Sequence, residues 1–199
     1  MLELVLASNN QHKIRELSIL LDPQLFKIVP PPEKLEVEEN GASYYENAHL
    51  KAKACFELCK CPVVADDSGL NVLAYPDELG IKSARFGGPG LKDEERTQLL
   101  LERVKKLPLE QRGAHYTCVL CFYLSPQEIY FFEGKLEGEL IEEWKGAGGF
   151  GYDPIFHPTG RPEGVTLAME EEWKEKNSHR SRAAQRAVSF FKGRICQKG

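Results

Sequence analysis

The sequence predicts an α/β fold in which helices flank a mixed central sheet. Its first half alternates short apolar runs with amphipathic helical stripes, whereas its second half is rich in long strand-like runs. With 199 residues, 42% of them hydrophobic, the chain can bury about 70% of the surface that its unfolded form exposes. These observations predict a single domain over residues 1–199.

The first half is expected to alternate between strands and helices. Its strands are uninterrupted apolar runs, as buried strands are, and its helices carry apolar residues every three or four positions. In chain order, we expect a strand at 2–7, a helix around 14–21, the extended prolines 30–32, a helix at 44–58, a strand at 62–65 and a helix at 94–107.

The second half predicts a hairpin and a closing helix. Strands at 114–124 and 129–133 flank a turn at 125–128, a further strand follows at 134–144, and a helix covers 178–192. Because α/β proteins bind ligands at strand ends, the polar clusters that follow predicted strands are the candidate site residues.

Composition limits the class of ligand. The net charge of −4 gives no global field that would attract nucleic acid, so any phosphate recognition must be local. The apolar run at 116–124 is half a membrane span, and the N-terminus lacks the basic lead-in of a signal peptide. We therefore expect a cytoplasmic protein that binds a small anionic ligand, with no nucleic-acid or membrane partner.

The six cysteines are scattered, which indicates reduced thiols rather than a disulfide framework. Cys118-x-x-Cys121 has a zinc-like spacing, but in a strand this odd separation sends the two side chains to opposite faces. Both are expected to be core residues.

A polar loop, Ser8-Asn9-Asn10-x-x-Lys13, directly follows the first predicted strand. Backbone N–H groups at the positive end of a helix, side-chain amides and Lys13 one turn later would suit a phosphate group. The loop has neither the GxxxxGK[ST] nor the GxGxxG pattern. An ordinary helix N-cap is the alternative, because Ser and Asn are favoured there.

Acidic residues follow the second predicted strand in the run Asp66-Asp67-Ser68-Gly69. Two adjacent carboxylates at the mouth of a buried strand are costly unless a cation neutralises them, which favours Mg²⁺. A carboxylate not used by the metal could accept a proton from an attacking water. The alternative is a simple turn. Glu38-Glu39 alone indicates only a solvated acidic turn.

A glycine-rich segment, 148–154, reads Gly-Gly-Phe-Gly-Tyr-Asp-Pro. Its glycines let the backbone approach a ligand closely, while Phe150 and Tyr152 offer faces for stacking and Asp153 an acceptor. The alternative is a loop with a core aromatic.

The chain resembles the Ham1-like inosine triphosphate pyrophosphatase family from about Leu4 to Phe191. The shared motifs occur in the same order: Ser8-Asn9-Asn10-x-x-Lys13, Glu46-Asn47-Ala48, Ala65 to Leu70, Ser83-Ala84-Arg85, Gly148 to Pro154 and Ser178-His179-Arg180. The resemblance implies an elongated two-lobed domain with a nucleotide cleft between the lobes. It also implies Mg²⁺-dependent hydrolysis of ITP, dITP and XTP to the monophosphate and pyrophosphate, which cleanses the nucleotide pool, usually by a homodimer.

The resemblance also implies residue roles. The triphosphate would be bound by Ser8, Asn9, Asn10, Gln11, His12, Lys13 and the catalytic Lys51. Mg²⁺ would be held by Glu39 and Asp67, and Asp67 would also be the base that acts on water. The remaining substrate contacts would come from Ser68, Phe150, Gly151, Tyr152, Asp153, His179, Arg180 and a lysine, with Phe150 stacked on the purine.

The chain departs from the family pattern next to His179. The family usually reads Lys-Asn-x-x-Ser-His-Arg, and this chain is two residues shorter, so the base-contacting lysine is Lys176 by motif or Lys174 by spacing. Ser8-Asn9-Asn10 also replaces the commoner Thr-Gly-Asn, although Asn tolerates left-handed backbone angles. Donors from Arg180, His179 or the lysine toward purine position 6 would favour hypoxanthine over adenine.

Two other functions remain open at this point, a Maf-like pyrophosphatase of pyrimidine or modified triphosphates and a non-catalytic nucleotide sensor. The aromatic-rich segment 116–132 allows a symmetric dimer interface, unless the monomer itself covers both of its faces.

Overall fold

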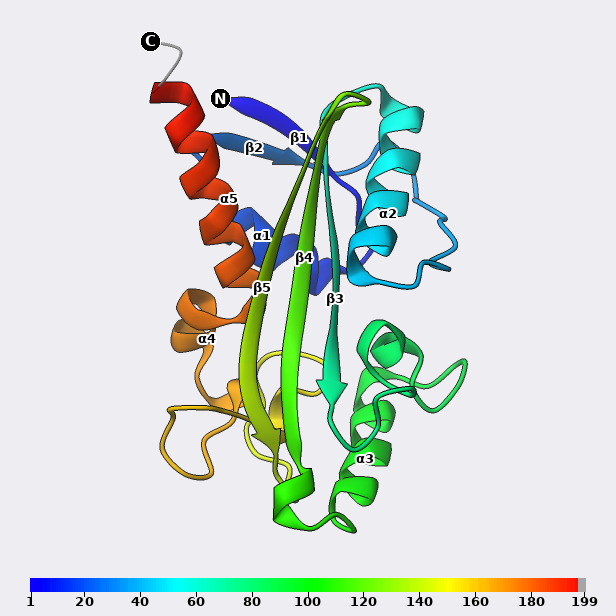
Figure 1. The fold of residues 1–199 in the computed structure, drawn as a ribbon, viewed down its shortest axis with the longest axis vertical. Helices are drawn as coiled ribbons and strands as arrows, with labels where there is room; N and C mark the ends of the chain where they lie inside the picture. The colour runs from blue at the N-terminus through cyan, green and yellow to red at the C-terminus, as the bar shows by residue number, and fades with distance from the viewer. Residues whose placement is uncertain (197–199) are drawn as a thin grey trace. The chain divides into compact units, whose positions relative to one another are not determined.

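A mixed six-stranded sheet with the strand order β2-β1-β3-β4-β5-β6 organises residues 1–196, which are the residues that the computed structural model describes (Figure 1). The strands are β1 (Leu2–Leu6), β2 (Phe26–Val29), β3 (Val63–Val72), β4 (Gly113–Ser125), β5 (Glu128–Leu140) and β6 (Phe156–Pro158). The α-helices are α1 (Gln11–Leu20), α2 (Tyr44–Cys59), α3 (Asp93–Val104), α4 (Glu171–Asn177) and α5 (His179–Cys196). Short 3-10 helices cover Gly80–Arg85, Leu109–Gln111, Asp153–Ile155 and Leu167–Met169.

The structure confirms the predicted α/β class and the hairpin, and it corrects several boundaries. The strands β2 and β6 and the helix α4 were not predicted, because each is seven residues or shorter and so carries little periodicity. The predicted break at Gly134 is absent and β5 is continuous. A Cβ atom at Gly134 would lie 2.1 Å from the carbonyl oxygen of His179, so this glycine marks a close approach of α5.

The strand β3 extends through the acidic run, so the turn predicted as the alternative at Asp66-Asp67-Ser68-Gly69 is wrong. Asp66 is 1% exposed and Asp67 5% exposed. Buried carboxylates of this kind need charged partners, and lysine and arginine side chains supply them.

The chain divides into two compact units. Unit 1 comprises Met1–Ser68, Cys118–Gly134 and the chain from His179 onward, and unit 2 comprises Gly69–Thr117 and Lys135–Ser178.

In unit 1, helices cover both faces of the sheet. Side chains alternate along β1, so Leu4 and Leu6 pack with α1 and α5, whereas Val5 and Ala7 pack with α2. Figure 1 shows α1 and α5 on one side of β1 and α2 on the other.

The topology of unit 1 places a candidate site at the end of β1. Parallel strands β2 and β3 flank β1, and the helices that connect them, α1 and α2, lie on opposite faces. Ligands of open α/β sheets bind outside the carboxyl ends of the strands at such a switch point. Because Leu6 pairs with Val64, the loop after β1 leaves the sheet next to the residues that precede Asp66 and Asp67.

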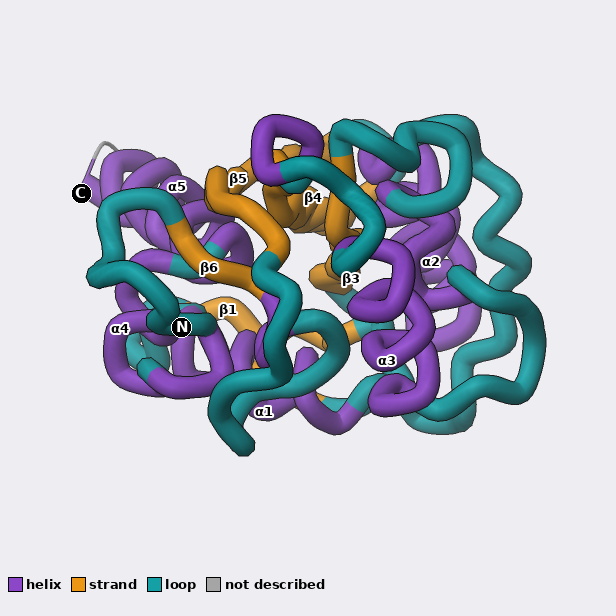
Figure 2. Tube along the Cα trace, turned by 90° about the horizontal axis from the view of Figure 1, so that it is seen from below, coloured by secondary structure: helices purple, strands orange, loops and turns teal. Residues whose placement is uncertain are grey.

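Unit 2 has its own hydrophobic core. Leu100, Leu101 and Val104 of α3 pack in one cluster with Phe156 of β6 and with Tyr152. Figure 2 shows α3 and α4 on opposite sides of the strands of this unit.

The cysteine predictions are confirmed for the thiols that the structure describes. Cys55, Cys59, Cys61, Cys118 and Cys121 are free. Cys118 and Cys121 belong to different core clusters, on opposite faces of the sheet. Within residues 1–196, we find no helix that combines the length and apolar character needed to cross a membrane.

Candidate active site

The loop after β1 is both a helix cap and a candidate anion site. Asn10 is the N-cap of α1, and its side-chain oxygen accepts hydrogen bonds from the backbone N–H groups of His12 at 2.9 Å and Lys13 at 3.2 Å. The capping alternative is therefore correct for this side chain. The cap fixes the helix N-terminus, whose positive end favours a bound anion.

Asn9 fastens this loop to the segment before α2. Its side-chain nitrogen donates to the carbonyl of Leu35 at 2.6 Å, and its oxygen accepts from the backbone N–H of Leu35 at 3.3 Å. Both functional groups of the Asn9 amide are thus used within the protein. The side chain holds the loop in place and has little capacity left to bind a ligand.

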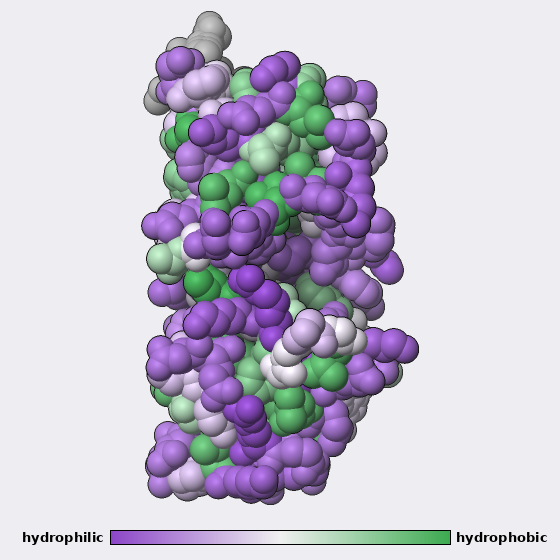
Figure 3. Space-filling view, turned by 90° about the vertical axis from the view of Figure 1, so that its right-hand side faces the viewer, coloured by the Kyte–Doolittle hydropathy of each residue, from purple (hydrophilic) through white to green (hydrophobic). Residues whose placement is uncertain are grey.

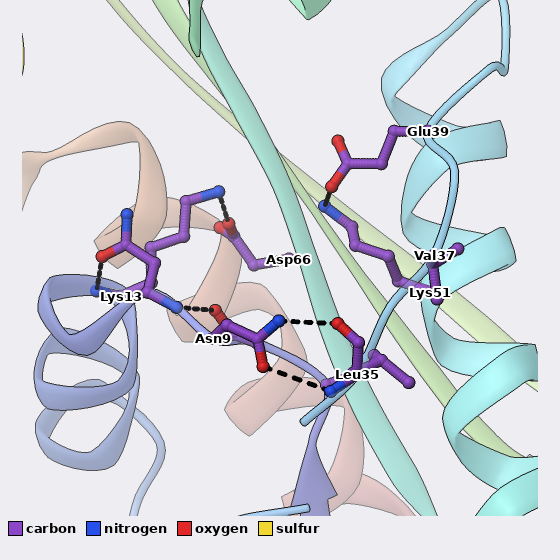
Figure 4. Close-up of a pocket in the computed structure, with 10 residues that line it drawn as sticks. Asn9, Lys13, Leu35, Val37, Glu39, Lys51 and Asp66 are labelled. Atoms are coloured by element: carbon purple, nitrogen blue, oxygen red, sulfur yellow. Dashed lines mark hydrogen bonds and ion pairs between the residues drawn. The ribbon is translucent and has the colours of Figure 1, made fainter. Parts of the chain in front are cut away.

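A pocket of about 250 Å³ opens at the end of β1, within unit 1 (Figure 4). It is lined by Ala7, Ser8, Asn9, Asn10, Lys13, Leu35, Val37, Glu39, Lys51 and Asp66. The structure thus brings together the loop, two lysines and two carboxylates that were predicted from separate motifs. Gln11 and His12 lie on the exposed first turn of α1 and do not line this pocket.

Lys51 joins the two carboxylates that were predicted to hold metal. Its ammonium lies 2.8 Å from one oxygen of Asp67 and 3.1 Å from Glu39. Burial lowers the pKa of Lys51, but the carboxylates of Asp67 and Glu39 outweigh it and raise this pKa, so the lysine stays charged. Burial raises the pKa of Asp67 to about 6, although Lys51 opposes the shift.

The second carboxylate oxygen of Asp67 is buried and accepts no hydrogen bond within the described residues. Such an orphaned oxygen is costly in a protein interior unless a ligand completes it. Glu39 lines the pocket at the end of β1, its side chain is 38% exposed, and Lys51 pairs with both Glu39 and Asp67. Together the two groups could hold a divalent cation.

Glu46 and Asn47, to which the sequence analysis assigned no role, hold the loop that carries Glu39 in place. Asn47 accepts a hydrogen bond from the backbone N–H of Gly41 at 2.8 Å, and Glu46 accepts one from Ala42 at 2.7 Å. A Cβ atom at Gly41 would lie 2.7 Å from Asn47, so only glycine allows this approach. These bonds give Glu46 and Asn47 a structural role in the loop that carries Glu39.

Asp66 is the centre of a second charged cluster in unit 1. One oxygen pairs with Lys13, and the other accepts from the guanidinium Nε of Arg180 at 3.0 Å. Burial raises the pKa of Asp66, but Arg180 and Lys13 outweigh it and hold this pKa well below its usual range. Asp66 is therefore ionised and fully engaged, unlike Asp67.

In unit 2, the glycine-rich segment forms a cluster around Asp153. Its carboxylate accepts hydrogen bonds from the backbone N–H of Phe150 at 3.0 Å and from Lys174 at 2.7 Å. The Lys174 ammonium lies 4.8 Å from the centre of the Phe150 ring. Gly149 has a φ of 71°, and a Cβ atom there would lie 2.2 Å from Asp153, so the loop requires glycine at this position.

This cluster distinguishes the two candidate lysines. Lys174 is 5% exposed and contacts Asp153, whereas Lys176 is exposed on α4. The lysine chosen by its spacing from His179, Lys174, therefore contacts the glycine-rich segment at Asp153. The lysine chosen by the motif, Lys176, is exposed.

Tyr152 was predicted to offer a face for stacking, and the structure contradicts this. Its ring is 6% exposed in the core of unit 2, and its hydroxyl donates to the carbonyl of Ser83 at 2.6 Å. The core alternative considered for this segment is thus correct for Tyr152. Phe150 is the aromatic of the segment that remains half-buried.

The predicted site residues fall in both units. Unit 1 holds Ser8 to Lys13, Glu39, Lys51, Asp67, Ser68, His179 and Arg180, and unit 2 holds Phe150 to Asp153, Lys174 and Lys176. His179 and Arg180 begin α5 and are 4% and 1% exposed. Glu16, which pairs with Arg180, was missed, although it follows Lys13 by one turn of α1.

Among the described residues, no three His, Cys, Asp or Glu side chains are arranged to hold a metal ion by themselves. A Mg²⁺ site does not require three, because Mg²⁺ is usually bound through one or two carboxylates, water and substrate phosphates. Glu39 and the orphaned oxygen of Asp67 fit this description.

The fold and the pocket define an α/β protein in which the capped N-terminus of α1 lies beside paired carboxylates. The chain belongs to the Ham1 family, whose model matches residues 4–190. It is 41% identical over 197 residues to a dITP/XTP pyrophosphatase of Leptospira interrogans, covering 96% of this chain and 97% of the relative. It is 44% identical over 186 residues to a dITP/XTP pyrophosphatase of Symbiobacterium thermophilum, covering 93% and 92%.

Solved structures agree with this assignment. A Ham1 protein from Coxiella burnetii is 33% identical with a TM-score of 0.85, and the similarity covers 97% of this chain and all of that one. The Ham1 protein of Staphylococcus aureus is 35% identical with a TM-score of 0.83, covering 96% and 99%.

Proposed function

We propose that this chain hydrolyses deaminated purine nucleoside triphosphates (ITP, dITP and XTP) to the monophosphate and pyrophosphate. It would thereby keep these nucleotides out of DNA and RNA, acting on the cytoplasmic nucleotide pool. The observation that carries the proposal is the pocket lined by Lys13, Lys51 and Glu39. Lys51 also pairs with Asp67, whose second carboxylate oxygen has no partner among the described residues. The names of the relatives support the same substrate class.

The residues of unit 1 have separate tasks in this reaction. Lys13 and the N-terminus of α1 neutralise the triphosphate, and Lys51 adds a second positive charge next to Asp67. Asp67 is ionised at neutral pH, since its pKa is about 6, and such a carboxylate can accept a proton from water. The water oxygen attacks the α-phosphorus, and the bond from this phosphorus to the bridging oxygen breaks to release pyrophosphate.

Glu39 and Asp67 would hold Mg²⁺. Both are carboxylates, and the second oxygen of Asp67 has no hydrogen-bond partner among the described residues. When bound, the ion would neutralise charge that develops on the phosphate oxygens. Lys51 keeps both carboxylates in place before the ion arrives, because it bridges them in the structure.

The bond that breaks can be tested with ITP and Mg²⁺ in ¹⁸O-labelled water. We expect IMP and pyrophosphate, with the label in IMP, because the attack is on the α-phosphorus. Label in orthophosphate with IDP as the product would contradict the proposal. A parallel panel of purine and pyrimidine triphosphates tests the class, since preference for pyrimidines would favour a Maf-like activity and binding without turnover a nucleotide sensor.

The acid limb of the pH profile should report Asp67. Its pKa is raised to about 6, so the carboxylate gains a proton as the pH falls through that value. Because a bound cation lowers the pKa of a carboxylate that holds it, we expect kcat/KM for ITP at limiting Mg²⁺ to fall by about tenfold per unit below this pH, since a protonated carboxyl can neither bind a cation nor accept a proton. A flat profile from pH 7 to 5 would contradict this role.

We also propose a homodimer. Much of the segment 116–132 is covered within the monomer, since Tyr116 and Tyr123 are 7% and 5% exposed. Phe131 remains 38% exposed beside Tyr45, with ring centres 5.5 Å apart. Figure 3 shows hydrophobic groups among hydrophilic ones on the face that carries α2. Phe131 and Tyr45 could form the centre of a symmetric interface.

Light scattering at micromolar concentration should give twice the chain mass of 22.5 kDa. Phe131→Glu should shift the protein to monomer, because a buried charge would then face its own copy. Glu128→Gln, on the same strand, is the control. A monomer mass for the unaltered protein would contradict the proposal.

A further inference from the structure

The segment that brings Glu39 to the pocket runs through the described residues 30–43 as neither helix nor strand. Leu35, Val37 and Glu39 line the pocket, whereas Glu36 and Glu38 between them are exposed. This alternation is that of an extended chain, in which successive side chains point to opposite sides. A shift of the stretch by one residue would therefore turn Glu39 away from the site and bring Glu38 to it.

The side chain of Asn9 fixes this stretch at Leu35. Its nitrogen donates to the Leu35 carbonyl at 2.6 Å and its oxygen accepts from the Leu35 backbone N–H at 3.3 Å (Figure 4). An amide that binds both main-chain groups of one residue imitates the exchange of two hydrogen bonds between neighbouring strands. Because both bonds go to the same residue, they select which residues of the stretch face the pocket.

Glu39 lies between two anchored residues. The chain before it is held at Leu35, and the chain after it is held at Gly41, whose N–H donates to the side chain of Asn47 at 2.8 Å. The Leu35 side chain also packs against the core cluster of β1 and α2. Held on both sides, the carboxylate of Glu39 reaches the Lys51 ammonium at 3.1 Å.

We infer that the Asn9 side chain is a positioning residue for the cation site, because it sets the register that directs Glu39, and not Glu38, toward Lys51. The inference rests on the proposed function, in which Glu39 helps to hold Mg²⁺. It concerns the side chain of Asn9 alone, so the backbone N–H groups at the start of α1 keep their role toward phosphate.

The first test follows hydrogen exchange of residues 33–40 by mass spectrometry, in the full chain without metal or substrate. We expect exchange to be about tenfold faster in Asn9→Ala, since the Leu35 N–H loses its acceptor and the stretch loses an anchor. Asn9 is exposed, so its truncation leaves no cavity. Gln24→Ala, another exposed amide in unit 1, is the matched control. Unchanged exchange in Asn9→Ala would overturn the inference.

The second test uses Mn²⁺ alone as the probe and follows the electron paramagnetic resonance signal of the free ion. We expect the Kd for Mn²⁺ to rise about tenfold in Asn9→Ala, as the loss of the two hydrogen bonds that order Glu39 predicts. Asn9→Gln keeps the amide on a longer stem, so it should recover part of the affinity. Asn9→Ser is too short to bind both groups of Leu35 and replaces Asn9→Ala if that variant does not fold.

Combined variants separate positioning from general damage. Glu39→Gln should weaken Mn²⁺ binding strongly in the unaltered chain and much less in Asn9→Ala, because Asn9 acts through Glu39. Glu38→Gln should have no effect in the unaltered chain but should lower the affinity further in Asn9→Ala, where this carboxylate can turn toward the site. Equal effects of Glu39→Gln in both backgrounds would overturn the inference.

The inference and the proposed function can fail separately, because hydrogen exchange needs neither metal nor turnover. If Mn²⁺ does not bind the unaltered chain, the proposed cation site is wrong, and the exchange of residues 33–40 still decides whether Asn9 fixes them. If the unaltered chain releases pyrophosphate from ITP while exchange is the same in Asn9→Ala, the function stands and the inference is wrong.

Discussion

Asp67→Asn is expected to lower the turnover of ITP by about 10²-fold or more, because it removes a metal ligand and a general base together. Asparagine has nearly the same shape, and Lys51 keeps its contact with Glu39, so the fold should remain intact. Initial rates of pyrophosphate release at saturating ITP measure the loss, and thermal unfolding of the same samples verifies the fold.

The control for this variant is Glu38→Gln, which alters an exposed carboxylate next to Glu39. Its rate should stay near that of the unaltered chain. Near-normal turnover in Asp67→Asn would remove the base role from this residue. Asp66 would be a poor replacement, since both its oxygens are engaged by Lys13, Arg180 and Cys118.

Sequence patterns predicted the helices and strands that are long enough to repeat their apolar spacing several times. The helices α2, α3 and α5 and the β4–β5 hairpin each repeat their apolar spacing several times, so their periodicity is clear. The four residues of β2 and the three of β6 do not. Their place in the sheet depends on pairing with β1 and β5, and single-sequence patterns contain no information on pairing.

Site residues could be predicted where a local backbone feature, such as a helix N-cap or a positive φ, requires a particular residue type. Asn10 at the helix cap and Gly149 at positive φ are such cases. The contacts of Tyr152 and Arg180 could not be predicted in this way, because their neighbours come from distant segments. Tyr152 binds the carbonyl of Ser83, and Arg180 binds Glu16 and Asp66, so their positions are set by tertiary structure.

The second large effect concerns the choice of base, and the cluster around Asp153 suggests its chemistry. Hypoxanthine has an O6 acceptor and an N1–H donor, and adenine reverses both. Lys174 is a donor and Asp153 an acceptor, and they lie 2.7 Å apart beside the Phe150 ring. A deaminated purine stacked on Phe150 would complement this pair, whereas adenine would mismatch at both positions. Such sites can discriminate by about 10⁴-fold, or roughly 5.5 kcal/mol.

We therefore expect Lys174→Met to lower kcat/KM for ITP far more than for ATP, compressing the ratio by about 10²-fold, since one of the two matched groups is lost. Lys176→Met, an exposed lysine on the same helix, should leave the ratio unchanged. Phe150→Ala should weaken both substrates together, because stacking is alike for all purines. Steady-state kinetics with ITP and ATP for the three variants gives the result. Equal losses on both substrates in Lys174→Met would mean that this lysine supports the loop through Asp153 and that the base is read by other groups.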